Sequence, residues 1–426
     1  MGLMFLFVKM TTAAIGYRAA ARALKVVSPV LPGGVFPTAN GGQFWVLRLG
    51  LHELTRAKEP ADDWVWIFDH TIQTGYGKCF IVVGVRLSVW ESKRADALAA
   101  DPNAPFALTR EDLSVWALER VDSSCGEAVR GQLEQLSEAT GITPRELLSD
   151  QGADLRGGGA LFCEGRATVA VHDIAHAVAN ALKRQLHKDA AWQEFLADAN
   201  HCKTQVRQTP YAFLMPPDLK SKSRWMNLEP LISWSRRVRR FLDDPRAGLA
   251  AAEAPDNLEA LEAKIGWLRK HAESIAVWGK MLEASAVILK YIRAHGYHRR
   301  APDDLERLLV DFPDGPSRAV VDEVLAFVRV QSARAGEGRL IGSSEVLESL
   351  IGTGKQLQGR NKHGYTKTVL GMAAAVMNLT PDIVETALAA VKVRDVHQWT
   401  RQKLGLGLQS QRQRALPLLS VGTKPG

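Results

Sequence analysis

Cysteine is scarce in this chain of 426 residues, which contains only four cysteines. Cys79, Cys125, Cys163 and Cys202 lie far apart, and no two of them form a Cys-x-x-Cys pair. This spacing supports neither a disulfide framework nor a cysteine zinc site, and it fits a protein of a reducing cytoplasm.

A long apolar run is lacking at the amino terminus. The apolar stretch at residues 1–8 is too short to cross a membrane, and it lacks the basic lead-in and small-residue cleavage site of a signal peptide. We therefore expect a cytoplasmic protein with no membrane partner, whose true start is either Met1 or Met10.

The excess of positive charge is small, since the chain has 54 Lys and Arg residues and 46 Asp and Glu residues. The net charge of +8 fits a polyanionic partner without requiring one.

The stretch from Trp64 to Leu87 organises the chain. Residues 64–68 form an unbroken apolar run, typical of a strand buried on both faces, and the run ends at Asp69. After a turn at Gly75–Gly77, residues 78–87 form a second apolar run, which predicts an antiparallel hairpin. The pattern predicts that Asp69 is held at the end of a rigid strand.

Residues 62–173 are predicted to form an α/β domain. After the hairpin, a strand, a helix, a strand, a helix and a strand are predicted at residues 114–118, 124–140, 145–150, 155–163 and 168–172. This order of elements is that of the ribonuclease H-like (RNase H-like) fold. Because the first and fourth strands of that fold end side by side, we expect Asp69 and Asp150 to be neighbours.

Helical patterns dominate the other segments. Residues 10–58 predict two helices joined by a Pro/Gly turn, either a DNA-binding helix-turn-helix with Arg48 on its second helix or a helical hairpin that only packs. Residues 174–335 predict an all-helical insertion interrupted by prolines. Residues 336–362 contain an acidic helix that belongs to the second part of the α/β core, and residues 363–426 are predicted to be helical with a basic tail.

Three acidic residues carry the strongest chemical prediction. Carboxylates of Asp69, Asp150 and Glu348 at one sheet edge would suit two Mg²⁺ or Mn²⁺ ions, because hard cations prefer oxygen ligands. Two such ions about 4 Å apart stabilise the attacking and leaving oxygens of a phosphodiester displacement. As ordinary alternatives, aspartates at strand ends form turns and helical glutamates are solvated.

Two of these residues have rivals nearby. Asp154 competes with Asp150, but it is expected inside the turn that follows the strand. Glu345 competes with Glu348. We prefer Glu348 because Lys355 follows it by seven residues on the same helical face, where its ammonium would contact a DNA phosphate.

Two other patterns are decoys. The segment Gly352-Thr-Gly-Lys355 lacks the first glycine of a P-loop and the Ser or Thr that follows its lysine. The segment His172-Asp-Ile-Ala-His176 mimics a metalloprotease motif, but it follows a predicted strand and has no third ligand at a suitable spacing.

Five segments together resemble bacterial insertion-sequence transposases of the DDE class. These segments are Ile67–Gly75, Leu148–Leu155, Gln208–Pro217, Arg224–Glu229 and Ser343–Lys355. The likeness covers most of residues 15–405 and implies an RNase H-like core, a five-stranded mixed sheet with helices, interrupted by a large helical insertion. It also implies metal-dependent cleavage and strand transfer at the ends of a mobile element, with Asp69, Asp150 and Glu348 as the triad.

A further segment, Asp173-Ile-Ala-His176, resembles a signature of hAT-type transposases. That likeness implies that His176 contacts DNA near the active site. Trp225 or Trp234 in the insertion would stack on an unpaired or flipped base, although core packing is the more common role of such tryptophans.

The sequence therefore predicts a DNA transposase that acts as a homodimer or larger homo-oligomer. We expect it to bind terminal inverted repeats and target DNA, in a bacterial cytoplasm and at the nucleoid when bound. Two other classes remain open: a catalytically silent DNA-binding protein or repressor derived from a transposase, and an RNase H-like nuclease without strand transfer.

Overall fold

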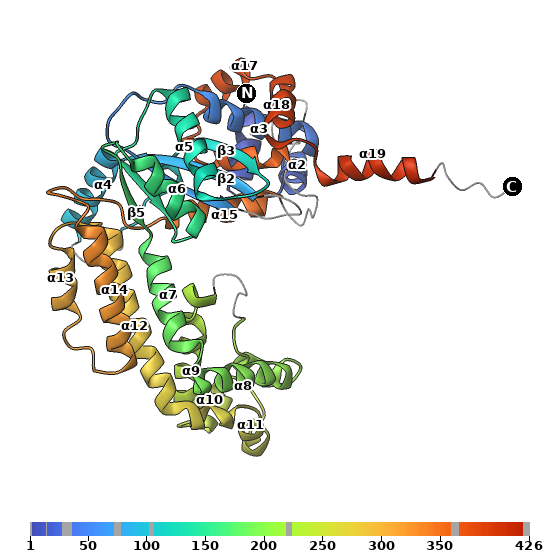
Figure 1. Cartoon of the computed structure of the whole chain (residues 1–426). Coiled ribbons are helices and arrows are strands. Elements are labelled where there is room, and N and C mark those ends of the chain that lie inside the picture. Colours follow the sequence, from blue (N-terminus) through green and yellow to red (C-terminus); the bar gives the residue numbers. More distant parts are fainter. Residues whose placement is uncertain are drawn as a thin grey trace. The chain divides into compact units, whose positions relative to one another are not determined.

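The computed structural model of the chain forms two compact units (Figure 1). Unit 1 consists of Met1–His172 and Ser343–Gly426, and unit 2 consists of Asp173–Gly342. The residues that the structure describes are 2–13, 15–27, 36–71, 78–101, 106–218, 224–358 and 366–420. The helical insertion predicted at residues 174–335 lies inside unit 2.

Unit 1 is built on a mixed sheet of five strands in the order β3-β2-β1-β4-β5. Strand β2 is antiparallel to both of its neighbours, whereas β4 is parallel to β1 and β5. The strands are β1 Trp64–Thr71, β2 Lys78–Arg86, β3 Ser114–Val121, β4 Glu146–Ser149 and β5 Val169–His172. The predicted five-stranded mixed sheet with helical regions around it is therefore confirmed.

The first strand is longer than its apolar run. The sequence predicted that β1 ends at Asp69, but the strand continues to Thr71, and Asp69 is paired with Ile81 of β2. The prediction was wrong because β2 supplies pairing partners along the whole of β1, so the ladder extends past the hydrophobic residues. Asp69 is therefore held within a sheet ladder. The predicted turn at Gly75–Gly77 lies outside the described residues.

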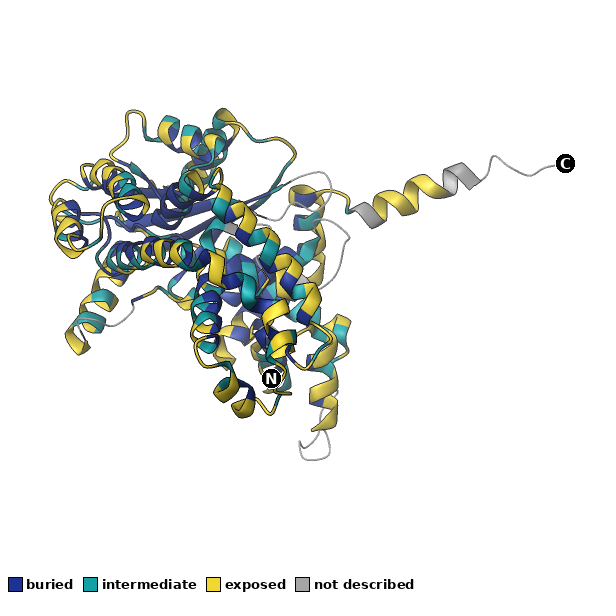
Figure 2. Cartoon of the chain, turned by 90° about the horizontal axis from the view of Figure 1, so that it is seen from below, coloured by how far each residue is buried: buried dark blue, intermediate teal, exposed yellow. Residues whose placement is uncertain are grey.

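One face of the sheet carries aromatic residues from β1. Because side chains alternate along a strand, Trp64, Trp66 and Phe68 point to the same face. Helices α5 (Gly126–Thr140) and α6 (Ala153–Cys163) pack on it and join this cluster, and the buried residues are dark blue in Figure 2. Burial of a ring such as Phe68 contributes about 1.5–3 kcal/mol, so this layer fixes β1 firmly.

The amino-terminal helices share a core with helices from the other end of unit 1. Helices α1 (Gly2–Thr12), α2 (Tyr17–Val26) and α3 (Ala39–Thr55) pack with α16 (Leu370–Ala375) and α17 (Pro381–Ala390). The two helices predicted within residues 10–58 are therefore part of unit 1. Helix α3 contacts α1, α2, α16, α17 and β3, so it has a packing role within unit 1.

Gly50 marks the close approach of α3 to α16. A Cβ atom there would lie 1.9 Å from the carbonyl oxygen of Leu370, which is backbone and cannot rotate away. We expect Gly50→Ala to lower the free energy of unfolding by about 1–3 kcal/mol, measured by urea denaturation. Gly131→Ala on α5 is the matched control, because an added Cβ meets nothing within 4 Å there. Equal midpoints for the two variants would contradict this packing.

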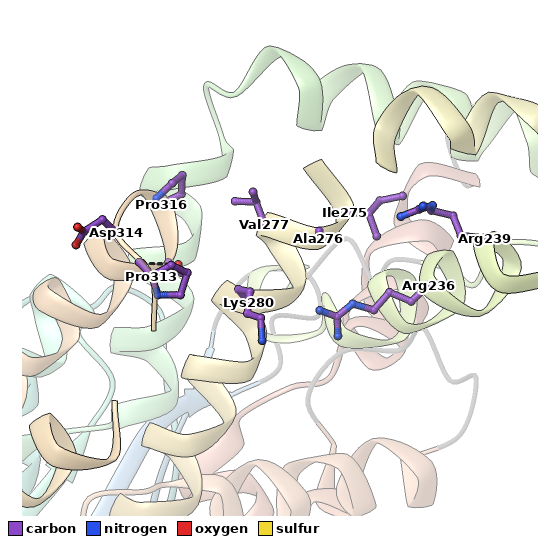
Figure 3. Close-up of a pocket in the computed structure, with 10 residues that line it drawn as sticks. Arg236, Arg239, Ile275, Ala276, Val277, Lys280, Pro313, Asp314 and Pro316 are labelled. Carbon is purple, nitrogen blue, oxygen red and sulfur yellow. Dashed lines mark hydrogen bonds between the residues drawn. The ribbon is translucent and has the colours of Figure 1, made fainter. Parts of the chain in front are cut away.

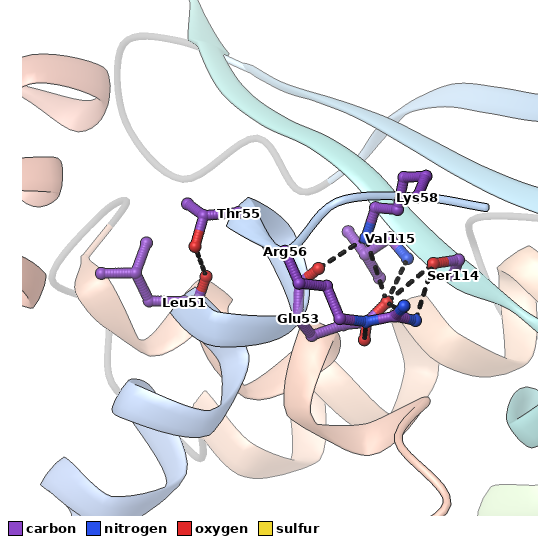
Figure 4. A network of polar contacts seen from close by, with 7 residues as sticks. All are labelled: Leu51, Glu53, Thr55, Arg56, Lys58, Ser114 and Val115. Carbon is purple, nitrogen blue, oxygen red and sulfur yellow. Dashed lines mark hydrogen bonds and ion pairs between the residues drawn. The ribbon is translucent and has the colours of Figure 1, made fainter. Parts of the chain in front are cut away.

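A buried carboxylate joins the end of α3 to β3 (Figure 4). Glu53, which is 2% exposed, accepts hydrogen bonds from the hydroxyl of Ser114 at 2.8 Å and the backbone N–H of Val115 at 3.3 Å. Arg56 and Lys58 also pair with this carboxylate. Burial lowers the pKa of Lys58 to about 8, although the negative charge of Glu53 opposes the shift. These contacts fix α3 against the sheet.

The remaining helices of unit 1 include one that the sequence did not predict. Helix α4 begins at Leu87, where a strand was predicted to end, and it continues without a break from β2. These remaining helices are α4 Leu87–Ala100, η2 Arg110–Asp112, α15 Glu345–Gln358, η6 Lys367–Val369, α18 Val393–Trp399, the π-helical turn η7 Thr400–Leu404 and α19 Leu408–Ser420.

Unit 2 is built from helices. Its α-helices are α7 Ile174–Leu186, α8 Ala190–Val206, α9 Glu229–Phe241, α10 Pro245–Ala251, α11 Leu258–Ile265, α12 Ala272–His295, α13 Ala301–Leu308 and α14 Pro316–Ser332. Short 3₁₀ turns occur at Ala212–Leu214, Arg224–Met226 and Gly266–His271. The buried side chains of Trp192, Phe195 and Trp278 pack together in this unit. Within the described ranges of the whole chain, no helix has the length and apolar character needed to span a membrane.

Candidate functional site

The two predicted aspartates lie in or directly after neighbouring parallel strands. Ile67 of β1 is paired with Leu148 of β4. This is the last pair of the register, and its continuation by two residues puts Asp69 level with Asp150, which directly follows the last residue of β4, Ser149. Neighbouring strands lie about 4.8 Å apart, and residues level with each other on parallel strands project to the same face. The topology therefore brings these two residues together.

Both positions belong to the face of the sheet opposite the aromatic cluster. Asp69 alternates with Phe68 and shares the face of Ile67. Helix α15, which carries Glu345 and Glu348 in its first turn, packs against β1. Because α5 and α6 occupy the aromatic face, the acidic helix and the two aspartates share the other face.

Short backbone contacts orient each carboxylate. Asp69 Oδ1 accepts a hydrogen bond from the N–H of His70 at 2.6 Å, and Asp150 Oδ1 accepts one from the N–H of Gly152 at 2.8 Å. A Cβ atom at Gly152 would lie only 2.9 Å from Asp150 Oδ1, so glycine leaves room for the carboxylate. Both aspartates are partly buried. They are pre-oriented oxygen donors, the kind of ligand that Mg²⁺ and Mn²⁺ prefer.

The direction of α15 follows from contacts near its two ends. Arg110 donates to the hydroxyl of Thr353 at 3.0 Å, and Arg110 lies just before β3, at the sheet edge where β1 also begins. Before the helix starts, the carbonyl of Gly342 accepts a hydrogen bond at 2.9 Å from the N–H of Ile174, which closely follows β5. The first turn of α15 therefore points toward the edge where β4 and β5 end.

The two glutamates of α15 differ in exposure. Glu348 and Lys355 are exposed, and their separation of seven residues puts them on one side of the helix. Glu345 is partly buried, and Leu347 and Leu350 form part of the buried side. Both glutamates make polar or ionic contacts in the structure. Glu345 therefore remains an alternative to Glu348 as the third acidic residue of the predicted triad.

The structure does not assemble the complete predicted triad. Among the described residues, no group of three or more His, Cys, Asp and Glu side chains is placed to hold a metal ion. Strand pairing brings Asp69 level with Asp150, but no such group joins Glu348 to them. The two-carboxylate pair is therefore the part of the candidate site that the fold itself positions.

A second polar cluster lies near the end of β1. His70 is adjacent to Asp69 in a strand and therefore points to the opposite face. Its Nδ1 lies 3.2 Å from Asp154 Oδ2, and its Nε2 lies 3.3 Å from the hydroxyl of Ser124. Asp154 belongs to the first turn of α6 and also lies 3.9 Å from Lys78 Nζ. These contacts engage Asp154 elsewhere and favour Asp150 as the partner of Asp69.

The pKa of His70 provides a test of the contact between His70 and Asp154. Burial lowers the pKa of His70, and the carboxylate of Asp154 partly opposes that shift. We expect Asp154→Asn to lower this pKa further, as measured by NMR titration of the imidazole. Asp122→Asn, at an exposed ion pair with Arg120, should leave it unchanged. An unchanged or raised pKa in Asp154→Asn would contradict the pairing.

The same lowered pKa has a consequence for stability. The pKa of His70 in the folded state lies below its ordinary value of 6.5, so the folded protein binds this proton less readily than the unfolded chain does. Its contribution to stability is therefore present above that pH and is lost as the pH falls toward the folded-state pKa.

Arg48, predicted to contact DNA, has intramolecular partners. Its Nε donates to the carbonyl of Val391 at 2.6 Å, and its Nη2 donates to the carbonyl of Leu388. These carbonyls lie at the end of α17, where basic groups satisfy otherwise unpaired helix acceptors. Arg48 therefore ties α3 to α17. Lys355, the other basic residue of unit 1 for which a DNA contact is predicted, is exposed.

The predicted DNA-contacting residues of unit 2 have different environments. Both the N–H and the Nδ1 of His176 lie within 2.9 Å of Asp173 Oδ2, at the start of α7. Trp234 is 7% exposed and donates its indole N–H to the carbonyl of Leu214 at 3.1 Å, so it is a core residue. Trp225 is only partly buried. Of the two tryptophans, only Trp225 retains appreciable exposed surface for stacking.

A hollow of about 330 Å³ lies within unit 2 (Figure 3). It is lined by Arg236, Arg239, Ile275, Ala276, Val277, Lys280, Pro313, Asp314, Pro316 and Ser317. Arg236 pairs with Glu283 at 2.8 Å, and Arg239 donates to the carbonyl of Ala272 at 3.3 Å. Its two guanidinium groups are thus already engaged within the unit.

Comparison with known proteins does not supply a family. No protein-family model matches the chain, and no curated protein matches it.

Proposed function

We propose that this protein is a metal-dependent DNA transposase of the DDE class. The observation that carries the proposal is the placement of Asp69 in β1 and of Asp150 directly after β4, the parallel neighbour of β1. The strand order β3-β2-β1-β4-β5, with β2 antiparallel to both of its neighbours, supports the RNase H-like fold implied by the resemblance. The helical unit inserted between β5 and α15 supports it as well.

The oxygen donors of the aspartate pair have the chemistry that divalent cations prefer. Asp69 and Asp150, with Glu348 or its rival Glu345, would hold two Mg²⁺ or Mn²⁺ ions through carboxylate oxygens. When bound, such ions stabilise the charge on the attacking and leaving oxygens of a phosphodiester. The chain's own contribution is orientation, because the β1 ladder and the Gly152 contact hold the two aspartates before DNA arrives. Lys355 would neutralise a nearby phosphate.

The proposed reaction is hydrolysis followed by transesterification. A water first attacks a phosphorus atom at the element's end and releases a 3′-hydroxyl, which then attacks a phosphodiester of target DNA. The partners are terminal inverted repeats, target DNA and further copies of the chain, because two ends must be joined. The setting is a bacterial cytoplasm, and the net charge of +8 is compatible with a nucleic acid partner.

Incubation of the protein with a labelled duplex carrying the element's own ends tests this proposal. The reaction is run with Mg²⁺, with Mn²⁺ and with a chelator, and cleaved and joined products are separated on a gel. Metal-dependent cleavage with joined products supports a transposase, whereas cleavage without joining supports a nuclease. Binding without cleavage under both metals would overturn the proposal in favour of a DNA-binding regulator.

A further inference from the structure

Two consecutive helices near the carboxyl end of unit 1 form a pair joined by a short connection. Helix α17 ends at Ala390, and α18 begins at Val393 and continues through η7 to Leu404. The connection is therefore only Val391 and Lys392. The backbone N–H of Lys392 donates to Asp395 Oδ2 at 2.7 Å, which closes the start of α18. A short connection and a closed helix start hold the second helix in a defined direction.

The inner side of this pair is anchored to α3. Val384 and Leu388 of α17 belong to the core that α3 shares, and Val396 of α18 is fully buried. The guanidinium of Arg48 binds the carbonyl of Val391 in the connection itself. Trp399 and Leu404 are also buried on this side. The second helix is thus a rigid element mounted on unit 1.

The outer side of the second helix carries one continuous polar stripe. Its members are Arg394, His397, Gln398, Arg401 and Gln402, and all of them are exposed, with the ring of His397 also in contact with Phe44 of α3. Their spacing of three or four residues puts them on one side of the helix. They line a shallow hollow of about 620 Å³. Among the residues that the structure describes, no acidic side chain lines that hollow, so the stripe offers positive charge together with amide groups.

The charges on the stripe are accessible. The side chain of Arg394 is 87% exposed and lies 3.5 Å from Asp395, an exposed pairing of the kind that contributes little energy. Arg401 has no ion-pair partner within the described part of the chain. Exposed Lys392 and Lys403 flank the stripe, with Lys403 paired to Glu119. The stripe is therefore a basic surface open to a polyanion.

We propose that this stripe reads base edges in the major groove of duplex DNA. A helix with its side chains is about 10–12 Å wide, which fits a major groove about 12 Å wide. Arginine pairs with two acceptors of guanine and glutamine pairs with adenine, so Arg394, Gln398 and Arg401 suit base recognition, while the flanking lysines suit phosphates. The inference deepens the proposed function, on which it rests, by assigning recognition of the ends to α17 and α18.

Binding is tested with the full-length chain in a chelator, so that no cleavage is needed. The probe is a library of DNA duplexes with a random centre, from which bound molecules are selected and sequenced. The variants are Gln398→Ala and Arg401→Ala. Arg299→Ala, which removes a 79% exposed arginine of unit 2, is the control for loss of charge. Unfolding curves confirm that each variant is folded.

The wild type is expected to select a defined sequence, and each variant should lose preference at one or two base positions. Arg401→Ala should weaken binding to the selected duplex by about 10- to 100-fold, while Arg299→Ala changes it little. Unchanged selection by both variants, no selection by the wild type, or equal binding to RNA or single-stranded DNA would overturn the inference. A protein that selects DNA through Arg401 but never cleaves it would refute only the proposed function.

Discussion

Asp69→Asn is expected to reduce metal-dependent DNA cleavage by about a thousandfold or more while leaving DNA binding intact. An amide is a neutral and weaker ligand than a carboxylate, and metal stabilisation of a phosphoryl transition state is worth several kcal/mol. Asp150→Asn should have an effect of the same size, because the two residues are level on neighbouring strands. The double variant should be little worse than either single variant, since residues that act as a unit are not additive.

Control variants distinguish the loss of a metal ligand from the general effect of removing a negative charge. Asp62→Asn removes an exposed carboxylate just before β1, at the opposite end of the same strand, and should retain cleavage. Glu348→Gln compared with Glu345→Gln identifies the third acid. Single-turnover cleavage under saturating protein is the measurement. Full activity in Asp69→Asn or Asp150→Asn would rule out the proposed site.

The second large effect concerns stability. Glu53→Ala should lower the free energy of unfolding of unit 1 by about 3–5 kcal/mol, the usual cost of removing one partner from a buried ion pair. The substitution leaves the side chain of Lys58, which is only 4% exposed, without its carboxylate, and it also removes an acceptor from Ser114 and Val115. Urea denaturation followed by tryptophan fluorescence measures the loss.

Glu59→Ala is the matched comparison. Glu59 is paired with Arg86 but is 67% exposed, so its removal should change stability by less than about 1 kcal/mol. Lys58 adds a pH dependence, because burial lowers its pKa from 10.5 to about 8. The unfolded chain binds this proton more readily, so the contribution of Lys58 to stability rises as the pH increases between these values. A Glu53→Ala variant as stable as Glu59→Ala would contradict the network.

The sheet could be predicted because its physical signals are local. The apolar and β-branched runs at residues 64–68 and 78–87 identify the strands directly. The proximity of Asp69 and Asp150 was a topological prediction, and the parallel register of β1 and β4 accounts for it. The end of β1 was misplaced because strand length depends on the partner strand as well as on hydrophobicity.

The role of α3 and the place of the third acid could not be predicted in the same way. A helix-turn-helix pattern within residues 10–58 carries no information about α16 and α17, which come from the other end of the chain and cover α3. The position of Glu348 depends on the direction of α15, which is set by tertiary contacts such as Arg110 with Thr353. The exposed stripe on α18 has a local signal in the sequence, because its Arg, His and Gln residues are spaced three or four apart. The prediction of a basic tail used the charges alone and did not include this spacing.

The core shared by α3, α16 and α17 has a consequence for synthesis on the ribosome. Roughly 300 residues separate α3 from α16, which at about 5–20 residues per second corresponds to a delay of about 15–60 s. During that time the apolar side chains of Val46 and Leu49 lack the carboxyl-terminal partners that bury them in the finished protein. A nascent chain that stops before α16 would expose this surface, so incomplete copies are expected to aggregate or to be captured by chaperones.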